Sequence, residues 1–210
     1  ENGMVKKDGE LCWEFDRLFQ EIKNGLKKCK EIGKIPVSMG VDTWGVDFVL
    51  MDKDDKVLGN TVGYRDHRNE GMDEEVYKTI SLEDLYARTG IQKAIFNTVY
   101  QLMAVKTKHP EYLEQAETML HVPDYFHYLL TGKKTCEYTE ATTGQLVNAE
   151  TKDWDYELID KLGYPRKMFQ KLIMPGTNIG HLSDKIREEV GFDLEVVAPA
   201  THDTGSAVLA

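Results

Sequence analysis

The sequence is short of cysteine and has no long apolar run, and both shortages narrow the class of protein. Its three cysteines, Cys12, Cys29 and Cys136, are widely spaced and include no C-x-x-C pair, so neither a disulfide framework nor a zinc site is indicated. No apolar run approaches the roughly 18 to 20 residues that cross a bilayer, and the polar residues 1–10 do not resemble a signal peptide. We therefore expect a cytoplasmic protein with no membrane partner.

Basic residues are scarce relative to acidic ones. The 26 Lys and Arg residues are outnumbered by 36 Asp and Glu residues, which gives a net charge of -10, and no stretch interleaves basic with aromatic side chains. The nucleotide signatures G-x-x-x-x-G-K-[ST] and G-x-G-x-x-G are also absent. These shortages argue against a nucleic-acid partner, and no local motif points to ATP.

What the sequence does contain predicts an α/β domain. In 210 residues, 41% hydrophobic content is enough for one sizeable core. Apolar periodicity and capping residues predict helices over 16–32, 98–108, 124–130, 156–162 and 184–190, and another that Ser81 begins and Gly90 ends. Shorter β-rich runs predict strands at 37–41, 46–51, near Val57, 118–122 and 194–198. Strands and helices are interspersed, as in α/β proteins.

The sharpest local feature is the segment 201–207, THDTGSA. A strand-like run ends just before Asp203 and a helix is expected just after it, which would expose the carboxylate where α/β sheets bind ligands. Asp203 could then act as a general base. It could equally cap the helix through backbone amides.

The same segment contains Asp-Thr-Gly-Ser, a string found in aspartic proteases, where two carboxylates share a proton. Only one copy occurs here, and the residues before it are rich in helix signals. A protease active site would therefore require a second copy of the chain.

Other candidates have structural interpretations beside the functional ones. The turn 42–45 places Trp44 and Gly45 where a backbone could approach a ligand, yet Trp44 could be a core residue and Gly45 could serve a positive-φ turn. His202 could be structural. Residues 64–68, YRDHR, are interpreted as a solvated charged rim, and the remaining histidines show no ligand spacing.

Taken together, ordered segments along nearly the whole chain resemble the FGGY family of carbohydrate kinases. These are 40–50 (GVDTWGVDFVL), 64–66 (YRD), 123–126 (PDYF), 137–139 (EYT) with 141–143 (ATT), 145–148 (QLVN) and 202–204 (HDT). The resemblance implies an α/β fold of the ribonuclease-H-like, actin-like ATPase type, with a mixed sheet flanked by helices. It also implies that residues 1–210 are most of the N-terminal sugar-binding domain, without the family's first β-hairpin and its C-terminal domain. The missing initial Met and the apolar final residues 208–210 also led us to expect a fragment.

Carried over by position, the family's catalytic base is Asp203, and its sugar contacts are Gly45, His202 and Thr204. Trp44 becomes a candidate for the pocket wall. The resemblance implies transfer of the γ-phosphoryl group of ATP, with Mg²⁺, to O1 of L-rhamnulose, which gives L-rhamnulose 1-phosphate in rhamnose catabolism. The ATP site would lie mostly outside residues 1–210, so these residues alone should be inactive. The alternatives are another ketose such as L-fuculose or, in a different class, a stand-alone sugar-binding module.

Overall fold

The structure, a computed structural model, describes residues 3–210 and has the α/β architecture expected from the sequence. Its helices are α1 (Phe15–Glu31), α2 (Met72–Tyr77), α3 (Leu82–Thr89), α4 (Thr98–Lys108), α5 (Pro110–Gln115), α6 (Val122–Thr131), α7 (Tyr138–Thr142), α8 (Tyr156–Leu162), α9 (Asp184–Val190) and α10 (Asp203–Leu209), with 3₁₀ turns η1 (His67–Asn69) and η2 (Arg166–Met168). Its strands are β1 (Val5–Lys7), β2 (Glu10–Cys12), β3 (Ser38–Met39), β4 (Phe48–Met51), β5 (Thr118–His121), β6 (Cys136–Glu137), β7 (Val147–Asn148), β8 (Asp153–Trp154), β9 (Leu172–Ile173), β10 (Asn178–His181) and β11 (Glu195–Val197).

The helix predictions are confirmed closely, because local signals set the helix ends. Helix α4 has the predicted bounds, and α1 differs from its predicted range by one residue at each end. At the start of α3 the Ser81 hydroxyl accepts a hydrogen bond from the Asp84 amide, while Gly90 ends the helix in the left-handed conformation. None of the helices in residues 3–210 combines the length and apolar character needed to span a bilayer.

The strand predictions are correct in place but too long, and the strands fall into several small sheets. Strand β3 pairs with β11 in parallel, and β11 pairs with β10 in antiparallel register. Strand β4 pairs with β5 in antiparallel register. The strand expected near Val57 is only a single bridge to Met51, and the β1–β2 hairpin was not predicted because every residue of β1 is exposed and shows no alternation.

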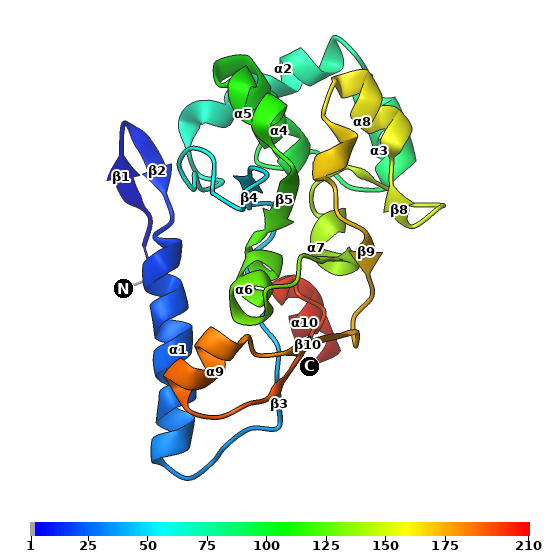
Figure 1. Ribbon diagram of the computed structural model, residues 1–210. Coiled ribbons are helices and arrows are strands. Elements are labelled where there is room, and N and C mark those ends of the chain that lie inside the picture. The colour runs from blue at the N-terminus through cyan, green and yellow to red at the C-terminus, as the bar shows by residue number, and fades with distance from the viewer. Residues whose placement is uncertain (1–2) are drawn as a thin grey trace.

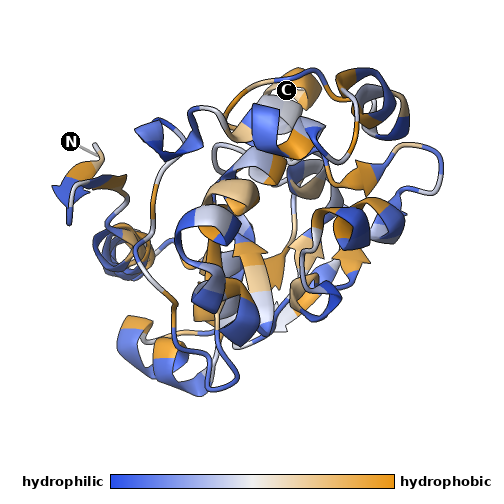
Figure 2. Ribbon diagram, turned by 90° about the horizontal axis from the view of Figure 1, so that it is seen from above, coloured by the Kyte–Doolittle hydropathy of each residue, from blue (hydrophilic) through white to orange (hydrophobic). Residues whose placement is uncertain are grey.

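The buried side chains form two clusters that meet along α1 and α6. The larger surrounds β4, β5 and α4, and the smaller lies under α9 and the β10–β11 pair. Helix α9 contacts α1, as Figure 1 shows at the lower left of the molecule. Figure 2 shows apolar residues gathered on inner strands and inward helix faces, with polar residues outside. Helices α1 and α9 therefore pack around the smaller cluster, beside the larger one.

Candidate active site

A pocket of about 450 Å³ lies where the chain leaves the parallel strands β3 and β11. All five residues predicted as site residues line it. The full lining is Trp44, Gly45, Val46, Tyr64, Ile91, Gln92, Ala94, Phe96, Asn97, Thr142, Thr143, His202, Asp203 and Thr204. The carboxyl ends of parallel strands are where open α/β sheets bind ligands, and the pocket occupies that position.

Backbone hydrogen bonds beyond the strands bring the turn 42–45 next to the segment 201–207. The Thr43 amide donates to the Thr201 carbonyl at 2.9 Å, and the Asp203 amide donates to the Thr43 carbonyl at 2.8 Å. This parallel bridge between Thr43 and His202 continues the β3–β11 pairing into the loops. Residues separated by more than 150 positions in the sequence therefore share one wall of the pocket.

Asp203 presents its carboxylate to solvent at the mouth of the pocket. Its side chain is 54% exposed, and it accepts a hydrogen bond from the Thr204 hydroxyl at 3.1 Å. The helix-capping interpretation is not what the structure shows: the N-cap residue of α10 is His202, and no side-chain cap bond forms there. The nearest nitrogen of the His202 ring is 3.9 Å from Asp203, too far for a hydrogen bond. The carboxylate is thus free to meet a ligand.

Glu137 fixes the backbone immediately before Asp203. It is fully buried, and its Oε2 accepts hydrogen bonds from the Thr201 amide at 3.1 Å and the Thr201 hydroxyl at 2.8 Å. The same carboxylate accepts from the amides of Thr139 and Glu140 at the start of α7. One buried side chain therefore ties α7, which ends at the pocket, to the segment that carries Asp203.

Gly45 lies against Thr143 rather than in a positive-φ turn. A β-carbon at position 45 would be 3.0 Å from Cγ2 of Thr143, which is tighter than ordinary packing allows. The positive φ of this turn, 71°, belongs instead to Val46, whose amide donates to the Thr143 hydroxyl at 3.1 Å. A β-branched residue in the left-handed region is strained and persists only when its surroundings hold it. The positive-φ interpretation of Gly45 was therefore wrong, and close approach explains the glycine.

The aromatic wall contains one residue, Phe96, that lies outside every segment the sequence pointed to. Besides Trp44 it includes Tyr64 and Phe96, whose rings meet edge to face with centroids 5.5 Å apart. Of the segment interpreted as a solvated rim, Arg65 and His67 are exposed, but Tyr64 faces the pocket and Arg68 is half-buried. Phe96 lies outside every segment that the sequence pointed to, whereas Thr143 is the last residue of the segment 141–143.

Comparison with known proteins agrees with this geometry. The model of the "FGGY family of carbohydrate kinases, N-terminal domain" matches residues 2–210. The chain belongs to the FGGY family of carbohydrate kinases. It is similar to a rhamnulokinase of Halalkalibacterium halodurans, 57% identical over the whole chain and 45% of that protein, and to one of Oceanobacillus iheyensis, 50% identical over the same shares. The chain therefore spans about half the length of the curated relatives it matches.

Solved structures of other sugar kinases have the same fold as this chain. A xylulose kinase from Rhodospirillum rubrum superposes over 98% of this chain and 44% of its own, with a TM-score of 0.88 and 18% identity. A ligand-bound xylulose kinase from Lactobacillus acidophilus covers 93% of this chain and 41% of its own, with a TM-score of 0.83 and 20% identity. The fold is thus the actin-like ATPase fold of these sugar kinases, as the resemblance implied.

The lining of the pocket is poor in groups that could hold a polyphosphate. No Lys or Arg is among the residues that line it. Phosphate groups are usually held by such cations or by a glycine-rich loop, and the sequence has neither nucleotide signature. The residues at this pocket therefore do not fit the triphosphate of ATP.

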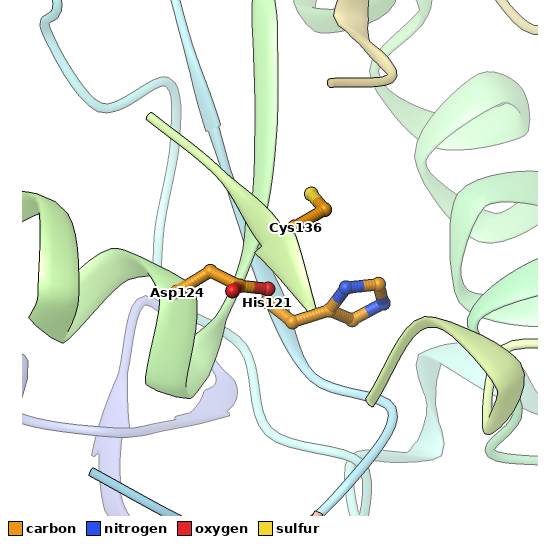
Figure 3. A group of neighbouring side chains, drawn as sticks. All are labelled: His121, Asp124 and Cys136. Atoms are coloured by element: carbon orange, nitrogen blue, oxygen red, sulfur yellow. The ribbon is translucent and has the colours of Figure 1, made fainter. Parts of the chain in front are cut away.

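A second group of titratable side chains lies in the interior, away from the residues that line the pocket. Donor atoms of His121, Asp124 and Cys136 lie within 4.8 Å of one another, and Figure 3 shows them converging from the end of β5, the start of α6 and β6. A structural zinc site takes four ligands, whereas three such residues meet here among residues 3–210, and the Cys136 thiol donates to the Met119 carbonyl at 3.7 Å. This grouping falls short of a structural zinc site.

Burial disfavours the charged forms of the side chains in that interior group. It lowers the pKa of His121 to about 4, and raises the pKa values of Asp124 and Cys136 well above their usual ranges. Glu140, also fully buried, has its pKa raised well above the usual range by burial and by the neighbouring carboxylates. Neither side-chain oxygen of Glu140 and neither ring nitrogen of His121 has a hydrogen-bond partner among the described residues.

Proposed function

We propose that the pocket is the sugar site of a kinase that phosphorylates L-rhamnulose at O1. The observation that carries the proposal is the free, half-exposed carboxylate of Asp203 at the mouth of a pocket walled by Trp44 and Phe96. Aromatic faces pack against the apolar faces of sugars, and a carboxylate beside a hydroxyl can accept its proton. The rhamnulokinase relatives, at 57% and 50% identity, support this substrate class.

In this proposal Asp203 takes the proton of the C1 hydroxyl as that oxygen bonds to the γ-phosphorus of ATP, while the bond from that phosphorus to the β-phosphate oxygen breaks and ADP leaves. Phosphoryl transfer depends chiefly on positioning and electrostatic stabilisation, and the chain's own contribution is to orient the acceptor. Gly45 lets the backbone approach the sugar, His202 and Thr204 flank the carboxylate, and Trp44 forms the wall. ATP and Mg²⁺ would bind mainly outside this pocket. Because the kinase uses ATP, we place it in the cytoplasm.

We further propose that residues 1–210 are most of the sugar-binding domain of a longer, two-domain kinase. The match to the family's N-terminal domain and the 45% share of the rhamnulokinase relatives support this assignment. Because the nucleotide must be held against the acceptor, these residues alone should show no turnover.

The test is ATP-coupled turnover by the full-length kinase that contains this chain, with L-rhamnulose, L-fuculose, L-ribulose and D-xylulose as acceptors. The proposal predicts the highest kcat/KM for L-rhamnulose, and phosphorus NMR of the product should show a 1-phosphate. Preference for L-fuculose would reassign the substrate within the family. Sugar binding with no turnover of any ketose would instead favour a stand-alone binding module.

A further inference from the structure

A single buried carboxylate, that of Asp47, sits directly behind the aromatic wall of the pocket. It is 1% exposed. Its Oδ2 accepts hydrogen bonds from the indole nitrogens of Trp13 at 2.7 Å and Trp44 at 2.9 Å, and from the Tyr64 amide at 3.1 Å. Its Oδ1 accepts from the side-chain amide of Gln101 at 3.0 Å. Every bond made to this carboxylate therefore has an N–H donor.

Gln101 extends the same network to the rest of the wall. It is fully buried, and its amide nitrogen also lies 2.9 Å from the Phe96 carbonyl and 3.2 Å from the Val46 carbonyl. Its oxygen accepts from the guanidinium of Arg68 at 3.1 Å. The side-chain amide is thereby oriented by its partners, with the nitrogen toward Asp47.

The network reaches three separate segments of the pocket but does not itself line it. It holds the Trp44 ring, the backbone of Tyr64 and the backbone of Phe96, and all three of these residues line the pocket. Asp47 and Gln101 are not among the lining residues. Their influence on a ligand must therefore pass through the residues they hold.

We propose that Asp47 and Gln101 are positioning residues that set the affinity and selectivity of the pocket for its sugar by fixing the aromatic wall. This inference rests on the proposed function of the pocket. A site holds its productive geometry only when the residues that contact the ligand are locked by hydrogen bonds behind them. Here one acidic side chain performs that role for both indoles and the Tyr64 backbone.

Replacing the Asp47 carboxylate by an amide tests whether this network holds the aromatic wall. Asparagine has the shape of aspartate but presents an NH₂ group on one side, and all four partners of Asp47 are donors. At least one donor must then face another donor, so Asp47→Asn should release either the indoles or Gln101. Gln101→Met, which keeps the length of the side chain and removes its amide, is the second variant.

Asp155 offers a matched control away from the pocket. It is a carboxylate of similar burial, 4% exposed, and it accepts two hydrogen bonds from the Arg88 guanidinium, at 2.7 and 2.8 Å. It also accepts from the Leu158 amide at the start of α8, and neither it nor Arg88 lines the pocket. Asp155→Asn should therefore lower stability without changing sugar affinity.

The experiment compares kcat and KM for L-rhamnulose in the full-length kinase carrying each variant, with circular dichroism as a second readout. Asp47→Asn and Gln101→Met should raise KM about tenfold or more while kcat changes less than about threefold, since the interaction is lost equally from bound substrate and transition state. The indoles of Trp13 and Trp44, with centroids 4.1 Å apart, should give an exciton signal that Asp47→Asn weakens and Asp155→Asn preserves.

The outcomes separate this inference from the proposed function. If the wild-type kinase phosphorylates L-rhamnulose but Asp47→Asn and Gln101→Met keep its KM, the positioning role is wrong and the function stands. An equal rise of KM in Asp155→Asn would also overturn it, because the effect would then be general destabilisation. If no ketose is phosphorylated, the proposed function fails, whereas the exciton signal still tests whether Asp47 holds the indoles. Should Asp47→Asn fail to fold, Gln101→Met decides.

Discussion

The buried carboxylates of the molecule fall into two groups that differ in how they are partnered. Behind the aromatic wall, both oxygens of Asp47 accept hydrogen bonds: Oδ2 from indole nitrogens and the Tyr64 amide, and Oδ1 from Gln101. Deeper inside, the side-chain oxygens of Glu140 and one oxygen of Asp124 have no partner among the described residues. Partnered polar groups specify one geometry, whereas unpartnered ones cost stability when charged.

The causes of the pKa shifts of Asp47 and Glu140 reflect this difference. Burial raises the pKa of Asp47, but hydrogen bonds from Gln101, Trp13, Trp44 and the Tyr64 backbone all oppose that rise. For Glu140, burial raises the pKa and the nearby carboxylates raise it further, with nothing opposing. We therefore expect changes on the pocket side to alter catalysis and binding, and changes in the interior group to alter how stability depends on pH.

The largest effect should come from Asp203 at the mouth of the pocket. In the full-length kinase, Asp203→Asn should lower kcat for L-rhamnulose by about 10² to 10⁴, the range of a lost general base, with KM changed by less than about threefold. Steady-state kinetics measures both quantities. Because the side chain is half exposed, the midpoint of denaturant unfolding should stay the same. Near-normal turnover would remove Asp203 as the base.

The next effect tests the close contact between Gly45 and Thr143. Gly45→Val should raise KM for L-rhamnulose about tenfold or more, because the added β-carbon would be 3.0 Å from Cγ2 of Thr143 and would displace the pocket wall. Adding Thr143→Ser, which removes Cγ2 and keeps the hydroxyl, should recover part of the loss. Gly25→Ala is the control, since its β-carbon would meet no other atom within 4 Å. An unchanged KM in Gly45→Val would remove this residue from the pocket.

In the interior group, His121 should make the domain sensitive to acid. Burial lowers its pKa to about 4, so the folded state binds fewer protons than the unfolded state between that value and about 6.5, and stability falls as the pH falls through this window. His121→Leu should reduce the loss between pH 7 and pH 5 by about 1 to 2 kcal/mol. His127, with a pKa also lowered to about 4, accounts for a remaining loss.

Urea unfolding at the two pH values measures this effect, with the exposed residue change His109→Gln as the control. Equal acid sensitivity in the wild type and in His121→Leu would show that the His121 ring finds a partner in solution.

The last effect concerns Glu140, whose influence on the pH dependence of stability should have the opposite sign to that of His121. Its raised pKa means that the folded state holds a proton that the unfolded state, with a pKa near 4.5, has released, so stability falls as the pH rises through this window. Glu140→Gln removes the titration and should be more stable than wild type at pH 8, with the difference in unfolding free energy closing toward pH 5. Unfolding curves at both pH values measure it, and the exposed Glu188→Gln should show no such trend.

The helices could be predicted from the sequence because their signals are local. Ser81, Gly90 and Gly132 each mark a helix end within a few residues of the periodic pattern, and the structure uses each of them in that way. The strands are harder, since pairing is non-local: β3 is only two residues long and is defined by its partner β11. The exposed β1 carries no alternating pattern at all.

The residues of the candidate site likewise divide into those that local motifs identify and those that only the fold brings to the pocket. Trp44, Gly45 and 202–204 lie in motifs that could be recognised, and the structure brings them to one pocket. Phe96 could not be found, because only folding places its loop against those motifs, and Thr143 lies in the recognised segment 141–143 but its contact with Gly45 depends on the fold. Asp47 and Glu137 lie inside recognisable segments, but their roles depend on donors that come from 34 and 64 positions away.

The measurement that tests the central claim most directly is calorimetric titration of L-rhamnulose into the full-length kinase without nucleotide. If the pocket holds the sugar, binding to the wild type is saturable, Gly45→Val weakens it about tenfold or more, and Asp203→Asn leaves Kd within about threefold. If Gly45→Val binds L-rhamnulose as tightly as the wild type does, the sugar is held elsewhere and the assignment of this pocket is contradicted.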